Sequence, residues 1–148
     1  MYDALAWDAN WAWSLPLIVV TVIFHVVGLA FINERMHVAR TYLRKKHHFL
    51  LAFAPIMGVG TLWVTLLHAV EAGIWASVYW FLGALPDGRS ALLYSLGAMT
   101  TYGHASFYLA PHWQLMGTLE ALNGVILFGL TTAFLFNMIR EVWPTSEM

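Results

Sequence analysis

The sequence predicts an all-α integral membrane protein that forms a single membrane domain over residues 1–148. Hydrophobic residues make up 60% of the chain and charged residues only 10%, whereas a soluble domain carries about a quarter charged residues. The charged residues are clustered, and the apolar stretches between them exceed the roughly 20 residues that a spanning helix needs. The formal net charge of −1 lacks the basic excess of a nucleic-acid binder, and the absence of cysteine excludes disulfides and thiolate metal sites.

Two transmembrane helices are expected in the first half of the chain, over residues 13–33 and 48–84. The segment between them, residues 34–47, holds five of the seven Lys and Arg residues, and it is therefore expected to be a cytoplasmic loop. A third apolar stretch, residues 113–140, ends at Arg140. If this stretch runs inward, Arg140 is cytoplasmic as well. The chain then has three spans, with its N-terminus outside and its C-terminus in the cytoplasm.

Residues 90–106 do not fit a spanning helix. Ser90 is expected to cap a short helix of about 11 residues, which at about 1.5 Å per residue covers about half of the hydrocarbon thickness. The segment that follows, up to Trp113, contains glycine, proline and several aromatic residues and is not expected to be helical. Such backbone is tolerated at membrane depth only where it is buried in protein or lines a cavity. The sequence therefore predicts a re-entrant segment.

Four stretches carry a family resemblance: Leu93–Leu96, Thr100–Gly103, and residues 119–124 and 132–136. Through them, residues 91–139 resemble the pore module of the potassium-channel superfamily, which consists of a pore helix, a filter and an inner helix. The wider layout resembles small bacterial ion channels with one extra helix before the two-helix pore unit. The resemblance implies that residues 90–106 form the pore helix and filter, that residues 113–140 form the inner helix, and that four copies surround a central pore.

The filter of that family reads Thr-Val-Gly-Tyr-Gly, and its backbone carbonyls replace the hydration shell of the ion. The residues aligned with this ion pathway are Thr100, Thr101, Tyr102, Gly103, His104 and Ala105. Thr101 and Gly103 match the family, whereas Ala105 replaces the second glycine, where a side chain is costly. The inner ion sites are therefore expected at Thr101, Tyr102 and Gly103.

Two roles are open for His104, which stands where the family has tyrosine. In the first, its ring packs against aromatic side chains of the pore helix. In the second, it faces the pore entrance as a ring of four imidazoles. Such a ring titrates near neutral pH, and it binds a transition metal or repels cations when protonated.

Polar residues interrupt the last apolar stretch. Glu120 is expected to be functional, because a carboxylate inside a membrane is costly; it hydrogen-bonds to the back of the pore helix, forms a cavity ring that attracts cations, or carries a proton. Asn123, Thr131 and Thr132 either line the cavity or form interhelical hydrogen bonds. Gly124 lies near the family's gating-hinge glycine, and its alternative role is a close helix–helix contact.

The weak candidates for metal ligands are His104, His68 and Glu71. His68 and Glu71 are spaced i, i+3 and share one face of the second helix. Two ligands do not make a metal site, so a structural hydrogen bond between them, or to the re-entrant segment, is the preferred interpretation. His25 lies in the middle of the first helix and is expected to be a neutral imidazole bonded to a neighbouring helix.

The resemblance implies a homotetrameric pore-loop channel that passes potassium or other monovalent cations with relaxed selectivity. It implies no enzymatic activity and no cofactor. It implies a prokaryotic inner membrane as the setting, with the bilayer and other copies of the chain as partners and without nucleic acid or a soluble regulator. One alternative is a channel-like protein that passes protons or a divalent metal, or that does not conduct. The other is a helix bundle that binds haem, although His25 and His68 are expected at different heights in the membrane.

Overall fold

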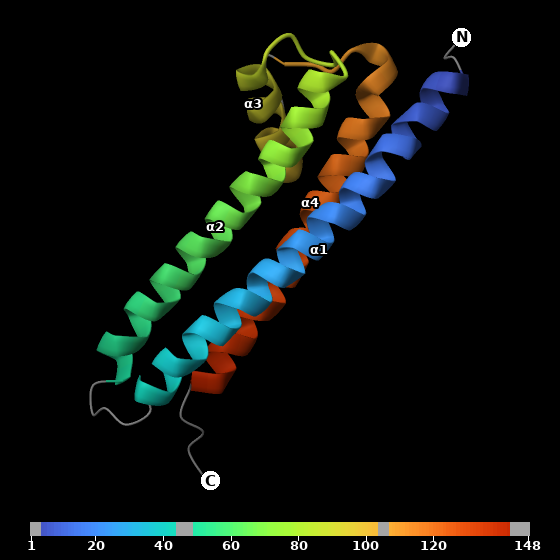
Figure 1. Cartoon of the computed structure of the whole chain (residues 1–148). Helices are drawn as coiled ribbons and strands as arrows, with labels where there is room; N and C mark the ends of the chain where they lie inside the picture. The colour runs from blue at the N-terminus through green and yellow to red at the C-terminus, as the bar shows by residue number, and fades with distance from the viewer. Residues whose placement is uncertain (1–3, 44–48, 104–106, 143–148) are drawn as a thin grey trace.

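The computed structural model describes residues 4–43, 49–103 and 107–142. These residues form four α-helices and one short 3-10 helix, and no strand. In chain order the elements are α1 (Ala4–Leu43), α2 (Phe49–Phe81), α3 (Gly88–Met99), η1 (Pro111–Trp113) and α4 (Gln114–Val142). The three long helices run side by side, and the short α3 lies beside one end of α2 (Figure 1).

Three helices are long and apolar enough to cross a membrane, over Trp7–Met36, Phe53–Phe81 and Pro111–Glu141. The prediction of three spans is thereby confirmed by length and composition. The beginning of α1 lies at the same end of the bundle as α3, whereas the end of α4 lies at the opposite end (Figure 1). This arrangement agrees with an odd number of spans.

The distribution of side chains is the reverse of that in a soluble protein. Large aliphatic side chains such as Val19, Ile23 and Leu62 are exposed on the outside of the bundle. Polar side chains are fully buried inside it: Ser14, Thr21, His25, Glu71, Ser95, Glu120 and Asn123. A lipid environment accounts for both features, because lipid solvates apolar surface and polar groups must find partners within the protein.

The helix boundaries differ most from expectation around the first helix, which was expected over residues 13–33. The observed helix continues to Leu43, so residues 34–43 of the expected 34–47 loop are helical. This segment is polar but contains neither glycine nor proline, and charged residues such as Glu and Arg are good helix formers. The charges therefore mark where the apolar span ends without ending the helix itself.

The end of α2 and the start of α3 are defined by local hydrogen bonds. Gly83 adopts a φ of 64°, and the Ala84 amide donates to the Tyr79 carbonyl at 2.9 Å, a pairing typical of a glycine-terminated helix. The N-cap of α3 is Asp87, so the expectation of Ser90 was wrong. Asp87 accepts hydrogen bonds from the Ser90 amide at 2.9 Å and the Ser90 hydroxyl at 2.7 Å. These bonds lower the pKa of the Asp87 carboxyl.

The short helix α3 reaches about halfway along the neighbouring spans. The hydroxyl of Ser95 lies 2.8 Å from the Ala72 carbonyl oxygen, a position about 14 Å before the end of α2 at about 1.5 Å per residue. Met99, the last residue of α3, packs against Gly124, about 15 Å from the start of α4 on the same scale. The chain then returns, because the Ala110 amide donates to the Ala84 carbonyl at 3.2 Å. The segment between α2 and α4 therefore enters and leaves the bundle at the same end.

Candidate functional site

The chain reverses direction directly after α3, in what we call the return segment, residues 100–103 and 107–110. Thr101 has a φ of 56° and Gly103 has a φ of 84°; this left-handed conformation is uncommon for a residue other than glycine. The Gly103 amide donates to the Gly97 carbonyl at 3.3 Å, which keeps the turn close to the last part of α3. Thr100, Thr101, Tyr102 and Gly103 are all exposed. His104 and Ala105, the other two expected ion-pathway residues, lie outside the described residues.

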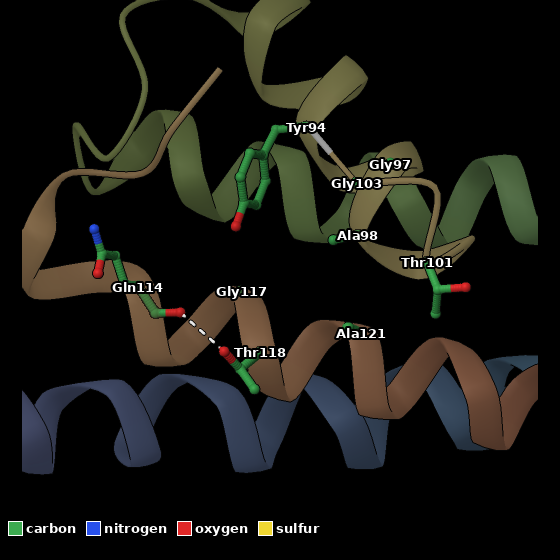
Figure 2. A pocket seen from close by; sticks show the side chains of 9 residues that line it. All are labelled: Tyr94, Gly97, Ala98, Thr101, Gly103, Gln114, Gly117, Thr118 and Ala121. Carbon is green, nitrogen blue, oxygen red and sulfur yellow. Dashed lines mark hydrogen bonds between the residues drawn. The ribbon is translucent and has the colours of Figure 1, made fainter. Parts of the chain in front are cut away.

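A pocket of about 290 Å³ lies between α3, the return segment and the first half of α4. Figure 2 shows Tyr94 pointing from α3 toward α4, where its hydroxyl lies against Gly117. Thr101 and Gly103 also line the pocket. Two of the expected ion-pathway residues therefore border an opening beside α4.

Glu120 joins three helices at the back of α3. Its side chain is fully buried, and one carboxyl oxygen accepts a hydrogen bond from the Tyr79 hydroxyl of α2 at 2.7 Å. The other carboxyl oxygen contacts the Ser95 hydroxyl of α3. Of the three roles considered for Glu120, hydrogen bonding to the short helix matches these contacts. Ser95 has a single hydroxyl hydrogen and also contacts the Ala72 carbonyl, so a protonated Glu120 satisfies all of these groups at once.

The neighbouring polar residues of α4 have separate partners. The Asn123 amide donates to the Thr21 hydroxyl of α1 at 2.8 Å, and both side chains are fully buried. Thr132 is exposed and donates only within its own helix, to the Phe128 carbonyl at 2.8 Å. Asn123 therefore forms an interhelical hydrogen bond, whereas Thr132 faces outward from the single chain.

Gly124 forms the close contact considered as the alternative to a hinge. A Cβ atom at this position would lie 2.7 Å from Met99 Cα and 2.8 Å from Met99 C. These are backbone atoms, which cannot move aside as a side chain does. The last turn of α3 therefore packs directly on the backbone of α4.

A second polar site, which we call the core cluster, consists of His25, His68, Glu71 and Thr131. Nδ1 of His25 lies 2.8 Å from Oε1 of Glu71, and Nδ1 of His68 lies 3.1 Å from Oε2. Nε2 of each imidazole lies 3.1 Å from the Thr131 hydroxyl oxygen. The cluster thus joins α1, α2 and α4 by a closed ring of contacts.

The expectation that His25 and His68 lie at different heights was wrong, because their ring centroids are 5.0 Å apart. The reason is the helical extension of α1. His25 lies 18 residues before the end of α1, and His68 lies 19 residues after the start of α2, so the antiparallel helices bring them level. The rings share Thr131 as a hydrogen-bonding partner, and this spacing leaves no room for a porphyrin between them.

The sequence predicted no contact with Glu120 for two residues that hydrogen-bond to it in the structure. Tyr79 and Ser95 resemble ordinary helix residues until their distance from Glu120 is known. Asn10 is a further residue for which the sequence predicted no role. Its side-chain amide donates to the His112 carbonyl at 2.6 Å, and its side-chain oxygen accepts from the Met116 amide at 2.8 Å. The only sequence signal for Asn10 is an amide side chain within an apolar, tryptophan-rich stretch.

No family model matches this sequence, and no curated protein or solved structure matches it.

Proposed function

We propose that the chain is one subunit of a homotetrameric pore-loop channel that passes potassium or other monovalent cations. In this proposal α3 is the pore helix, the residues from Thr101 to Gly103 form the inner part of the filter, and α4 is the inner helix. The observation that carries the proposal is that residues 100–103, the first part of the return segment, are exposed and non-helical at about half the depth of the spanning helices.

Lipid cannot surround this backbone. The amides of Thr101 and Gly103 donate to carbonyls of α3, but hydrocarbon offers no hydrogen-bonding partner to the backbone carbonyls of this segment. Irregular backbone at membrane depth must therefore be covered by protein or line a water-filled cavity. In the single chain Thr101 is exposed, and Tyr102 is 90% exposed. Further copies of the chain around a symmetry axis would shield this backbone from lipid and would enclose a shared aqueous path. The number four comes from the resemblance to the potassium-channel pore module.

The electrostatics of this arrangement favour a cation. The C-terminal end of a helix carries partial negative charge, and α3 ends at Met99, directly before the return segment. The Thr101 hydroxyl and the backbone carbonyls are hard oxygen ligands of the kind that replace water around a permeating cation. Passive conduction needs no further chemistry from the protein.

A substitution at Gly103 tests the ion pathway. We expect Gly103→Ala to abolish potassium flux in proteoliposomes, because its φ of 84° disfavours a side chain and its carbonyl belongs to the proposed filter. The flux is measured with a potassium-sensitive dye after a gradient is applied. Gly83→Ala is the matched control, since Gly83 also has a positive φ, of 64°, but lies in the loop after α2.

The two variants distinguish a filter defect from general backbone strain. We expect Gly83→Ala to retain flux and Gly103→Ala to lose it, with both proteins having the native mass of four chains in detergent. Equal flux through the two variants would count against Gly103 as a filter residue. A wild-type protein that reconstitutes as a tetramer without any flux would favour the non-conducting alternative.

A further inference from the structure

We infer that His25, His68 and Glu71 of the core cluster form a binding site for one divalent transition metal ion of the zinc class. Thr131 would hold both imidazoles in place from the opposite side. This inference concerns a part of the bundle separate from the return segment. It does not depend on ion conduction.

The three side chains provide the ligand types and the spacing that such an ion requires. One ligand atom from each lies within 4.8 Å of the others. The two contacts with the carboxylate, at 2.8 Å and 3.1 Å, are close to the separation of about 3.3 Å between ligands of a tetrahedral zinc ion with bonds of about 2.0 Å. Two histidines and one glutamate are also a known zinc ligand set that leaves a fourth position for water or hydroxide.

A count of hydrogens shows that the ring of contacts lacks one proton, and with it one positive charge. Each of its four contacts needs one hydrogen between two heavy atoms. Two neutral imidazoles and the Thr131 hydroxyl supply three, and an ionised Glu71 supplies none. One contact would therefore join two lone pairs. His68 Nδ1 and Glu71 Oε2 are such a pair: they lie 3.1 Å apart, both are buried, and neither has a partner with hydrogen-bond geometry.

A metal ion satisfies both imidazoles and the carboxylate of the cluster at once. Both Nδ1 atoms and the carboxylate then coordinate the ion through their lone pairs. Both Nε2 atoms carry a hydrogen and donate it to the Thr131 oxygen, which accepts two hydrogen bonds. A hydrogen-bonding partner on the far nitrogen is the usual way in which a metal-bound histidine is oriented.

The surroundings of the cluster fit a bound ion. His25 and Glu71 are fully buried, and the side chain of His68 is only 14% exposed, so the cluster is enclosed within the bundle. The ring of His68 stacks on Phe128 with centroids 4.6 Å apart, which fixes its orientation. Imidazole and carboxylate ligands favour zinc-class ions over metals that require thiolates.

Cobalt titration of the full chain tests the site, because Co²⁺ occupies zinc sites and absorbs visible light there. We expect the chelator-stripped protein in detergent to bind one Co²⁺ per chain with ligand-field absorption, and Zn²⁺ to displace it. His25→Ala and Glu71→Gln should remove this absorption. Thr131→Val should weaken Co²⁺ binding by roughly 10- to 100-fold, the usual effect of losing a partner of a metal-bound histidine.

His112→Ala is the control, because His112 is an exposed histidine of η1, outside the core cluster. It should bind Co²⁺ like the wild type. Circular dichroism checks that each variant is folded. If a variant does not fold, X-ray absorption of the zinc-loaded wild type decides, and we expect two imidazole nitrogens in the coordination shell at about 2.0–2.1 Å. The inference is overturned if the wild type binds no Co²⁺, as a cluster closed by a proton would predict, or if folded His25→Ala and Glu71→Gln retain the absorption.

Discussion

Replacing Gly124 by alanine is expected to lower the free energy of unfolding by about 1–3 kcal/mol, the usual cost of overpacking a close contact. The added methyl group would lie 2.7 Å from Met99 Cα, so α3 and α4 must separate to accept it. Because Met99 immediately precedes the return segment, this separation also moves Thr101. We therefore expect Gly124→Ala to reduce potassium flux as well as stability, measured by thermal unfolding and by proteoliposome flux.

Gly129→Ala on the same helix is the matched control. Gly129 has no neighbouring atom within 4 Å of the position of a Cβ, and alanine is a better helix former than glycine. This variant should be as stable as the wild type or slightly more stable. If Gly124→Ala behaves like Gly129→Ala, then α3 does not pack on α4 as described.

Replacing Glu120 by alanine is expected to lower the free energy of unfolding by roughly 2–5 kcal/mol, because two buried hydroxyl groups lose a partner. The hydroxyl of Tyr79 would lose its 2.7 Å hydrogen bond, and Ser95 would retain only the Ala72 carbonyl. The contacts that hold α3 between α2 and α4 would weaken together. Thermal or denaturant unfolding in detergent measures the loss.

A double-mutant cycle separates the hydrogen bond from general effects of the substitution. Tyr79→Phe should destabilise the wild-type protein but have little further effect in the Glu120→Ala background, because the two residues share one interaction. Glu141→Gln serves as a control for removing a carboxylate from α4, since Glu141 is exposed near the end of that helix. Additive effects of the Tyr79 and Glu120 substitutions would contradict the hydrogen bond between them.

The positions of the spans could be predicted from the sequence because they depend on composition alone. Runs without charges indicated the three long helices, and the stretch after Met99 that contains glycine and aromatic residues indicated an interrupted segment between the second and third. The capping residue was less predictable, since Asp87 and Ser90 are both good N-caps and only their geometry distinguishes them.

The partners across the bundle could not be predicted, because they depend on the register between helices. A shift of several residues in where α1 ends or α2 begins changes the height of every residue on α1 relative to α2. For this reason the sequence suggested only His68 and Glu71 as a pair, whereas the structure adds His25 and Thr131. Tyr79 and Ser95 could not be predicted as partners of Glu120 for the same reason, because these contacts also depend on the register between helices.

The proposed channel requires that the return segments of several copies surround a cation path. Its most direct test is current through a planar bilayer that contains the purified wild-type protein, with different potassium chloride concentrations on the two sides. We expect single-channel currents whose reversal potential lies near the equilibrium potential of potassium. A folded tetramer that carries no current, or a current that reverses at the equilibrium potential of chloride, would contradict it.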